Sequence, residues 1–424
     1  MNYMSGLNQM QKEAVQTTEG PLLLLAGAGS GKTRVLTCRI AYLIEENGVS
    51  PWNILAITFT NKAAKEMKER TARLVGEIKA EDMWVSTFHS MCTRILRRDG
   101  DRLGYSRYFA IYDTADQKAV IKEVIRQLNI NEKNFPVASV LAAISTQKNE
   151  LITPKQMMDL AKGDYRQRTI AEIYEAYQRK LLANNAMDFD DLLMNTYFLL
   201  RDYEDVLSFY QNKFRYIMVD EYQDTNRAQY HLVKLLADKY QNLCVVGDDD
   251  QSIYGWRGAD IRNILDFERD FPKTKIIKLE QNYRSTKNIL EAAYHIVSNN
   301  TARKDKKLWT ENEQGDIITV LQMENEYREA EQIANTIIQE VEKGERDYKD
   351  FAVLYRTNAQ SRLFEEKFVY GNIPYKIVGG INFYGRKEIK DLLAYLKTVS
   401  NGRDDLAVKR IINIPKRGIG VATL

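Results

Sequence analysis

Residues 22–33 read LLLLAGAGSGKT, an apolar run that ends in a glycine-rich loop and opens an amphipathic stretch. Glycines let backbone N–H groups turn inward around phosphate oxygens, and the N-terminus of a following helix adds a positive dipole. Lys32 is then expected to reach the β- and γ-phosphates of a nucleotide, and the Thr33 hydroxyl to hold Mg²⁺. A plain glycine-rich turn before a helix is the alternative, and it fits this strand–loop–helix context poorly. The expected phosphate-site residues are Ala26, where the general pattern has glycine, Gly27, Ala28, Gly29, Ser30, Gly31, Lys32 and Thr33.

Short apolar runs alternate with amphipathic stretches on both sides of this loop. Strands are predicted at residues 22–26, 54–59, 84–87, 216–220, 243–247 and 275–279. Helices are predicted after most of them, at residues 32–44, 62–75, 89–99 and 227–240. Because buried strands that alternate with helices are typical of doubly wound sheets, the pattern predicts an α/β domain with a mostly parallel sheet.

The alternation stops between residues 107 and 186, which are helix-like nearly throughout and contain no convincing strand. A second α/β pattern begins near residue 281. It has predicted helices at 285–299, 327–343 and 361–370, and predicted strands at 317–322, 351–355 and 375–378. The expected divisions are a first α/β domain in two parts, 1–106 and 187–280, a helical insertion, 107–186, a second α/β domain, 281–384, and the start of a second helical insertion, 385–424.

An acidic pair follows the apolar run in YIMVDEYQDTN, which begins at residue 216. A carboxylate at the carboxyl end of a parallel strand lies where α/β sheets bind ligands. Asp220 is expected to bind Mg²⁺, directly or through water, and Glu221 to position and deprotonate the attacking water. The alternative is an acidic pair that caps a helix, which becomes improbable beside a phosphate-binding loop.

A third polar segment, VVGDDDQSIYGWRGAD, follows another apolar run and covers residues 245–260. Gln251 is the expected sensor of the γ-phosphate, since an uncharged amide bonds to phosphate or to water. Four carboxylates in this segment raise the possibility of a metal cage. Their tight spacing before a turn favours loop capping instead; they are Asp248, Asp249, Asp250 and Asp260.

Aromatic side chains recur beside polar groups at the predicted strand ends. Aromatic faces stack on bases of any sequence, while basic and hydroxyl groups grip phosphates. The candidates for stacking are Phe59, Phe88, His89, Phe189, Tyr254 and Trp256, and those for phosphate contact are Asn61, Lys62, Thr87 and Arg257. A lone aromatic at a strand end is more often part of the core, but clustering at the functional edge of a sheet favours a polynucleotide track.

Composition sets weaker limits. The formal net charge of +3 permits a local basic stripe without requiring nucleic-acid binding. The three cysteines, Cys38, Cys92 and Cys244, form no CxxC pair and suggest a reducing, cytoplasmic setting. No signal-peptide core and no apolar run of about 18 residues is present, so we expect no membrane association.

These segments, in this order, resemble the PcrA/Rep/UvrD family of superfamily 1 DNA helicases, most closely its PcrA branch. The resemblance runs from residue 7 to the end of the chain and is carried by LNQMQKEAV, PWNILAITFTNKAA, DEYQDTNRAQY, LEQNYRST and AVLYRTNAQSR. It implies two RecA-like P-loop domains with helical insertions, ATP and Mg²⁺ as cofactors, and 3′→5′ movement on DNA. The implied partners are single-stranded DNA, single-strand/duplex junctions and proteins of repair or replication.

The resemblance also implies roles for individual residues. Gln11 would read the adenine, Arg34 and Tyr283 would pack on that base, and Arg284 would reach the γ-phosphate from the second motor domain. Phe59, Phe189, Tyr254 and Trp256 fall where the family stacks bases. Arg257 would bridge DNA and nucleotide. Further DNA contacts are implied for Tyr355, Arg356 and Asn358 in the second domain.

The chain departs from the family pattern in two places. Gly255 stands where close relatives often have arginine. The last two family motifs, one of which carries a second arginine finger, are missing, so we expect an incomplete second domain. Such arginines are worth about 10³–10⁵ in rate in related phosphoryl transfers. The alternatives are therefore an ATP- and DNA-binding fragment with little hydrolysis, and an unrelated P-loop enzyme such as a small-molecule kinase.

Overall fold

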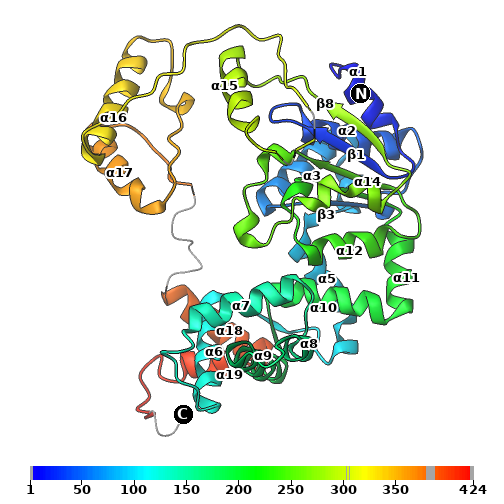
Figure 1. The fold of residues 1–424 in the computed structure, drawn as a ribbon, viewed down its shortest axis with the longest axis vertical. Coiled ribbons are helices and arrows are strands. Elements are labelled where there is room, and N and C mark those ends of the chain that lie inside the picture. Colours follow the sequence, from blue (N-terminus) through cyan, green and yellow to red (C-terminus); the bar gives the residue numbers. More distant parts are fainter. Residues whose placement is uncertain (1–2, 302, 305, 379–386, 421–424) are drawn as a thin grey trace. The chain divides into compact units, whose positions relative to one another are not determined.

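The computed structural model describes residues 3–301, 303, 304, 306–378 and 387–420 (Figure 1). The chain divides into two compact units, one of residues 1–316 with 397–409 and the other of residues 317–396 with 410–424. Among the described residues, no helix has both the length and the apolar character that crossing a membrane requires.

The first unit is built on a six-stranded parallel sheet. Its strands lie in the order β3-β2-β6-β7-β1-β8. They are β1 (Leu22–Ala26), β2 (Ile54–Thr58), β3 (Trp84–Thr87), β6 (Tyr216–Val219), β7 (Leu243–Gly247) and β8 (Lys275–Leu279). The central strand β1 places Leu22 opposite Cys244 on one side and opposite Lys275 on the other. All six strand predictions are confirmed to within one residue, and so is the parallel sheet.

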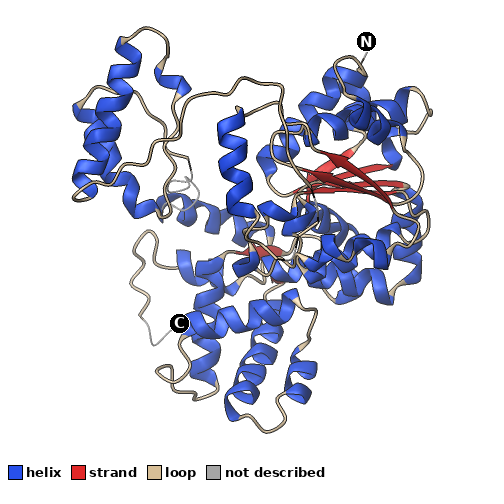
Figure 2. Cartoon of the chain, turned by 45° about the horizontal axis from the view of Figure 1, so that its top comes forward, coloured by secondary structure: helices blue, strands red, loops and turns tan. Residues whose placement is uncertain are grey.

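Helices cover both faces of this sheet, as Figure 2 shows. Successive β1 side chains point to opposite faces, so Leu22 and Leu24 join one core cluster while Leu23 and Leu25 join the other. This two-sided burial explains the uninterrupted leucine run. The helices around the sheet are α1 (Gln9–Gln16), α2 (Lys32–Glu45), α3 (Asn61–Val75), α4 (Glu77–Glu81), α5 (Phe88–Asp99), α10 (Phe189–Asp202), α11 (Glu204–Lys213), α12 (Arg227–Ala237), α13 (Arg262–Leu265) and α14 (Phe267–Asp270). Helix α15 (Lys287–Val297) follows β8 and has no buried residue.

A separate helical cluster interrupts the chain between β3 and β6. Its helices are α6 (Thr114–Gln127), α7 (Val137–Asn149), α8 (Pro154–Leu160) and α9 (Tyr165–Ala183), packed around their own apolar core. The prediction of no strand in this region was wrong. Strands β4 (Ala110–Tyr112) and β5 (Ala186–Asp188) pair in parallel where the cluster begins and ends. Three residues are too few to show a twofold alternation, and their partner lies more than 70 residues away along the chain.

Residues near the C-terminus pack on this cluster within the first unit. Asn401 Nδ2 donates to the carbonyl oxygens of Asn184 (3.0 Å) and Asn185 (3.1 Å). The hydroxyl of Tyr112 donates to Asp404 Oδ1 at 2.6 Å. The two C-terminal helices are α18 (Lys387–Ser400) and α19 (Asp405–Ile411), in agreement with the helical pattern predicted for the end of the chain.

The second unit contains α16 (Glu326–Glu342) and α17 (Ser361–Tyr370), which pack through Ala330, Ile337 and Phe368. Both helices agree with the prediction. The three strands predicted for this unit do not form in the described residues 317–322, 351–355 and 375–378. Several of their apolar side chains face solvent, Ile317 with 86% of its surface exposed. An apolar alternation shows which side chains could be buried, but a strand also needs a neighbour that accepts its backbone hydrogen bonds.

Candidate functional site

The glycine-rich loop leaves β1 at the carboxyl edge of the sheet and opens α2. Gly31 caps α2 with φ of 83° and Gly29 has φ of 69°, both in the left-handed region that glycine adopts at little cost. A Cβ on Gly29 would lie 2.6 Å from Asn282 Nδ2. The Ser30 hydroxyl donates to the Gly27 carbonyl at 2.7 Å. The loop thus needs glycine both for its backbone angles and for the close approach of a neighbour.

Lys32 begins α2 and points toward the acidic pair. Its ammonium lies 3.1 Å from Glu221 Oε2. The same oxygen accepts a hydrogen bond of 2.9 Å from Gln223 Nε2. Glu221 has φ of 50°, a backbone conformation that is uncommon outside glycine and that clusters at functional sites. The structure therefore brings the predicted phosphate-binding cation and the predicted base together.

Asp220 follows β6 directly, precedes Glu221 and is buried. Burial, and next the charge of Glu221, raises the pKa of Asp220 to about 6. Its Oδ1 accepts from the Glu221 N–H at 3.0 Å, and within the described part of the chain it forms no ion pair. This buried carboxylate feels the charge of Lys32, the first residue of α2, and its oxygens are of the kind that Mg²⁺ prefers as ligands.

Gln251 lies in the turn after β7. Its Nε2 donates to Asp248 Oδ2 at 2.5 Å, and the Asp248 N–H donates to Gln223 Oε1 at 3.0 Å. Gln223 is buried and bonds to the segments after both β6 and β7. The sequence analysis missed Gln223, although an amide that bonds through both its oxygen and its nitrogen is well suited to link two carboxylate-bearing loops.

The residues expected around the base lie on the other side of the loop. Gln11 Nε2 donates to the Ser30 carbonyl at 2.9 Å, and Gln11 Oε1 accepts from the Asn8 N–H. Asn8 Nδ2 donates to the Tyr283 hydroxyl at 2.9 Å. The Arg34 guanidinium donates to the Ser5 carbonyl at 2.8 Å. Gln11 thus contacts the second half of the phosphate loop, at Ser30, while Asn8 links Tyr283 to α1 and Arg34 contacts the segment before α1.

Asn282, which the sequence analysis did not single out, fixes Arg284 beside the loop. Asn282 Nδ2 donates to the Ala28 carbonyl at 2.6 Å, and its Oδ1 accepts from the N–H groups of Arg284 and Ser285, each at 2.8 Å. The Tyr283 N–H donates to the Gly29 carbonyl at 3.0 Å. The Arg284 side chain is exposed at the rim of the site.

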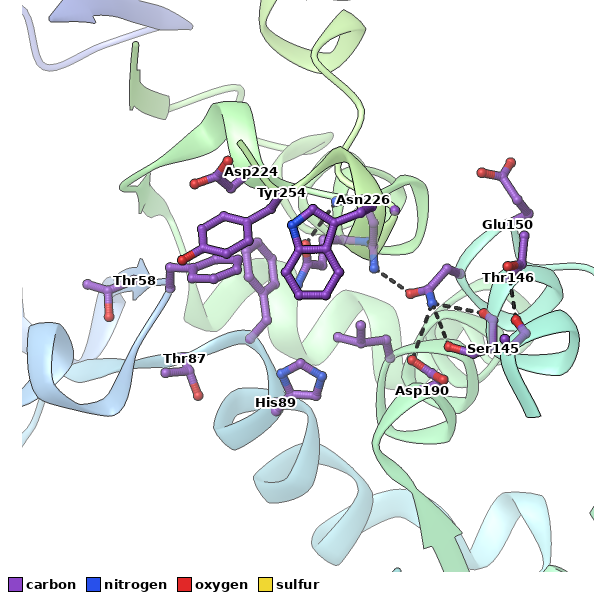
Figure 3. A pocket seen from close by; sticks show the side chains of 18 residues that line it. Thr58, Thr87, His89, Ser145, Thr146, Glu150, Asp190, Asp224, Asn226 and Tyr254 are labelled. Atoms are coloured by element: carbon purple, nitrogen blue, oxygen red, sulfur yellow. Dashed lines mark hydrogen bonds between the residues drawn. The ribbon is translucent and has the colours of Figure 1, made fainter. Parts of the chain in front are cut away.

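A cavity of about 600 Å³ opens at the same edge of the sheet, and Figure 3 shows its lining. The rings of Phe59 and Tyr254 stack with centroids 5.3 Å apart, and Trp256 lies 6.3 Å from Tyr254. His89 also lines the cavity and meets the neighbouring Phe189 ring edge-on at 5.7 Å. Trp256 is 69% exposed and Phe189 48% exposed. The cavity lined by Phe59, His89, Tyr254 and Trp256, here called the aromatic cavity, thus adjoins the exposed ring of Phe189 through His89.

Polar groups border the aromatic cavity. Thr87 caps α5 and donates to Asn61 Oδ1 at 3.4 Å, while Asn61 and Lys62 are exposed at the start of α3. Burial lowers the pKa of His89, which keeps its imidazole neutral at pH 7. The opposite wall comes from α7, where Asn149 bonds to Asp190, a contribution that sequence reasoning missed (Figure 3).

The other predicted DNA contacts are Arg257, Tyr355, Arg356 and Asn358. The side chain of Arg257 is outside the part of the chain that the structure describes. Tyr355, Arg356 and Asn358 belong to the second unit. There Tyr355 stacks on Phe364 at 6.4 Å, the Arg356 N–H donates to Gln360 Oε1 at 3.0 Å, and Asn358 begins a 3₁₀ turn.

The loop-capping interpretation of the acidic cluster is confirmed for two of its members. The Asp248 side chain accepts from the Asp250 N–H at 3.2 Å, and Asp260 Oδ1 accepts from the Arg262 N–H at 3.0 Å. The remaining interactions of Asp248, Asp249 and Asp250 are with Lys306 and its neighbours and are described below.

Family models and curated relatives all relate this chain to one family of DNA helicases. The family model described as the UvrD/REP helicase N-terminal domain matches residues 7–272, and that described as the UvrD-like helicase C-terminal domain matches residues 277–424. The chain is 58% identical over 429 residues to the ATP-dependent DNA helicase PcrA of Bacillus subtilis (strain 168), covering 100% of this chain and 58% of that protein. It is 58% identical over 421 residues to PcrA of Staphylococcus aureus (strain NCTC 8325 / PS 47), covering 99% and 57%. The chain thus spans little more than half the length of the curated relatives it matches.

Proposed function

The chain belongs to the UvrD/Rep helicase family, and from that premise we propose that it carries the ATP-hydrolysing motor of a 3′→5′ DNA helicase. The observation that carries this proposal is the shared sheet edge. The Lys32–Glu221 pair and the aromatic cavity both lie at the carboxyl ends of the parallel strands of one unit.

ATP hydrolysis is assigned to the residues around the phosphate loop. The loop N–H groups and Lys32 bind the phosphates, and Lys32 leaves Glu221 as it does so. Glu221 is then released to accept a proton from the attacking water, while Gln251 and Arg284 contact the γ-phosphate. Thr33 and Asp220 would hold Mg²⁺, which neutralises phosphate charge. Gln11, Arg34 and Tyr283 enclose the adenine.

Single-stranded DNA is the proposed occupant of the aromatic cavity. Bases stack on Trp256, Tyr254, Phe59 and Phe189, whose faces accept any base. Asn61, Lys62, Thr87, His89 and Arg257 contact the strand, as do Tyr355, Arg356 and Asn358 of the second unit. Single-strand/duplex junctions and proteins of repair or replication are the proposed partners, and the cytoplasm the proposed location.

Hydrogen bonds link the two sites through the backbone. The Asp260 N–H donates to the Thr225 carbonyl at 2.9 Å, and Asn263 Nδ2 donates to the same oxygen at 2.9 Å. The Ser252 hydroxyl donates to the Gln223 carbonyl at 3.3 Å. A shift of the segment that carries Glu221 would therefore move the segment that carries Tyr254 and Trp256, which supports coupling of hydrolysis to movement on DNA.

The test is ATP hydrolysis by this chain with and without a single-stranded oligonucleotide. We expect DNA to stimulate hydrolysis, and Lys32→Ala to abolish it. Hydrolysis that persists in the Lys32→Ala variant would contradict the assignment. Nucleotide binding without any turnover in the unsubstituted chain would instead favour a protein that only binds ATP and DNA.

A further inference from the structure

Three consecutive aspartates, Asp248, Asp249 and Asp250, follow β7, and one ligand oxygen from each lies within 4.8 Å of the others. The ammonium of Lys306 occupies the space between them. It lies 2.9 Å from Asp248 Oδ1 and 2.8 Å from Asp250 Oδ2, and it also bonds to Asp249. Lys306 is 3% exposed, so this cluster is satisfied by a buried cation of the chain itself.

Neighbours of Lys306 reinforce the contact. The Arg303 guanidinium makes two hydrogen bonds to Asp250, of 3.0 and 2.8 Å, and the Lys304 N–H donates to Asp249 Oδ2 at 2.7 Å. Leu308 follows and packs so closely on the phosphate loop that a Cβ on Gly27 would lie 2.2 Å from it. The described residues between Arg303 and Leu308 thus touch both the phosphate loop and the turn after β7.

Lys306 also neutralises the charge of the three carboxylates around it. Burial lowers the pKa of the ammonium, but the three carboxylates outweigh burial and the net effect raises it, so Lys306 stays charged. Removing one partner of a buried ion pair leaves the others uncompensated. Without the ammonium, neighbouring carboxylates repel one another, and Asp248 Oδ1 keeps only the longer hydrogen bond of 3.2 Å from the Asp250 N–H.

The two oxygens of Asp248 have separate tasks. Oδ1 faces Lys306, and Oδ2 accepts the 2.5 Å hydrogen bond from Gln251 Nε2. Rotation of the Asp248 carboxylate would therefore displace the Gln251 amide. Lys306 therefore acts on Gln251, the residue proposed to contact the γ-phosphate, through a single intervening side chain, that of Asp248.

We propose that Lys306 is a positioning residue that orients Gln251, through Asp248, for recognition of the γ-phosphate. This inference rests on the proposed function, in which Gln251 contacts that phosphate. The same contact assigns the three-aspartate cluster to a lysine rather than to a divalent cation.

The test compares equilibrium affinities for ATPγS, which carries a γ-phosphoryl group, and for ADP, which does not. The unsubstituted chain should prefer ATPγS. In Lys306→Met we expect that preference to fall about tenfold, as expected for one hydrogen bond to a charged group, with ADP affinity unchanged. Gln251→Ala should show the same loss. The matched control is Lys304→Met, which removes an ammonium that bonds to Glu268 at the surface and should keep the preference.

A second variant guards against simple misfolding. Lys306→Met with Asp249→Asn removes one charge of each sign, so the cluster keeps its net charge. We expect this double variant to bind ADP normally and still to lack the preference. An unchanged preference in either variant, or an equal loss of ADP and ATPγS affinity in both, overturns the proposal. These affinities do not require turnover, so failure of DNA-stimulated hydrolysis in the unsubstituted chain would contradict the proposed function separately.

Discussion

At the scale of the residue, the functions of Lys32 and Glu221 are coupled, because the Lys32 ammonium lies 3.1 Å from the Glu221 carboxylate. A phosphate that binds Lys32 competes with Glu221 and leaves the carboxylate free to act on water. Glu221→Gln should therefore retain nucleotide affinity and lose hydrolysis by about 10²–10⁴-fold, the usual contribution of a general base. Nucleotide titration and steady-state ATPase measured on the same preparation check this. Wild-type turnover would mean that another group is the base.

Asp220 predicts a dependence of stability on pH. Its pKa in the folded chain is about 6, above the value of about 3.9 for an unfolded aspartate. The folded state therefore binds this proton more tightly, and ionisation costs stability as pH rises from about 4 through 6. Asp220→Asn should raise the free energy of unfolding by about 3 kcal/mol at pH 7 and by little at pH 4. Urea denaturation at both pH values measures this, and equal gains at the two would contradict it.

Trp256 is the most exposed ring of the aromatic cavity, at 69%, so its face is accessible to a base. Trp256→Ala should weaken binding of single-stranded DNA by about 1–3 kcal/mol, the range for one stacked base. Fluorescence anisotropy of a labelled oligonucleotide measures the change. Trp52→Ala is a suitable control because Trp52 is half-exposed, lies outside the cavity and stacks on Lys213. Similar losses in both variants would argue against a specific stacking role.

At the scale of the element, the turn between β5 and α10 depends on a buried ion cluster. Lys148 of α7 lies 2.6 Å from Asp188 and 2.7 Å from Asp191, and none of these side chains is more than 2% exposed. The two aspartates also form the capping box of α10, whose first residue is Phe189. The cluster therefore fixes the start of α10 and with it Phe189, whose ring contacts His89 of the aromatic cavity.

Lys148→Met should lower the free energy of unfolding by about 3–5 kcal/mol, because it leaves two buried carboxylates without their cation. Lys180→Met is the control, since the Lys180–Glu123 pair is partly exposed and such pairs contribute about 0–1 kcal/mol. Both variants can be compared by urea denaturation. A small effect at Lys148 would show that water or protonation replaces the lysine.

Elements differ in how far sequence predicts them. The strand β1 follows from four leucines and a glycine-rich loop, a pattern that few other structures satisfy. The short strands β4 and β5 depend on each other across the intervening helices, and no local window contains that pairing. The strands expected at 317–322, 351–355 and 375–378 are rich in apolar residues, but local composition does not supply the neighbouring backbone that a ladder requires.

Site residues also differ in how far the sequence predicts them. Lys32, Glu221 and Gln251 belong to local motifs in which residue type and spacing follow from phosphate chemistry. Asn282 and Lys306 act on residues far away in the sequence. Lys306 belongs to a run of basic residues, and such a run usually lies exposed to solvent. Only the structure shows that Lys306 is buried against three carboxylates.

At the scale of the whole molecule, parallel strands collect the functional groups at one edge. Because every strand of the main sheet runs in the same direction, the loops after β1, β2, β3, β6 and β7 emerge together. The loops after β1, β6 and β7 form the phosphate site, and those after β2, β3 and β7 supply aromatic rings. The loop after β7 contributes to both, so it is the natural route of communication between them.

The affinity of the proposed site for single-stranded DNA should depend on ionic strength. The proposed phosphate contacts include the exposed Lys62, and binding a phosphate releases condensed counterions. The logarithm of the affinity for single-stranded DNA should fall linearly with the logarithm of salt concentration, with a slope of about −0.7 for each phosphate neutralised. Lys62→Ala should make that slope shallower by roughly one contact. A slope of zero in the parent chain would exclude a phosphate-gripping track.

The pairing of β4 with β5 has an evolutionary consequence. The chain leaves the main sheet and returns to it through two adjacent short strands, so the helices between them form an exchangeable module. Lengthening a loop whose ends are already held together adds little entropic cost. Descendants of an ancestral motor could therefore have rebuilt α6 to α9, and with them the wall of the aromatic cavity that α7 supplies, while every strand kept its place.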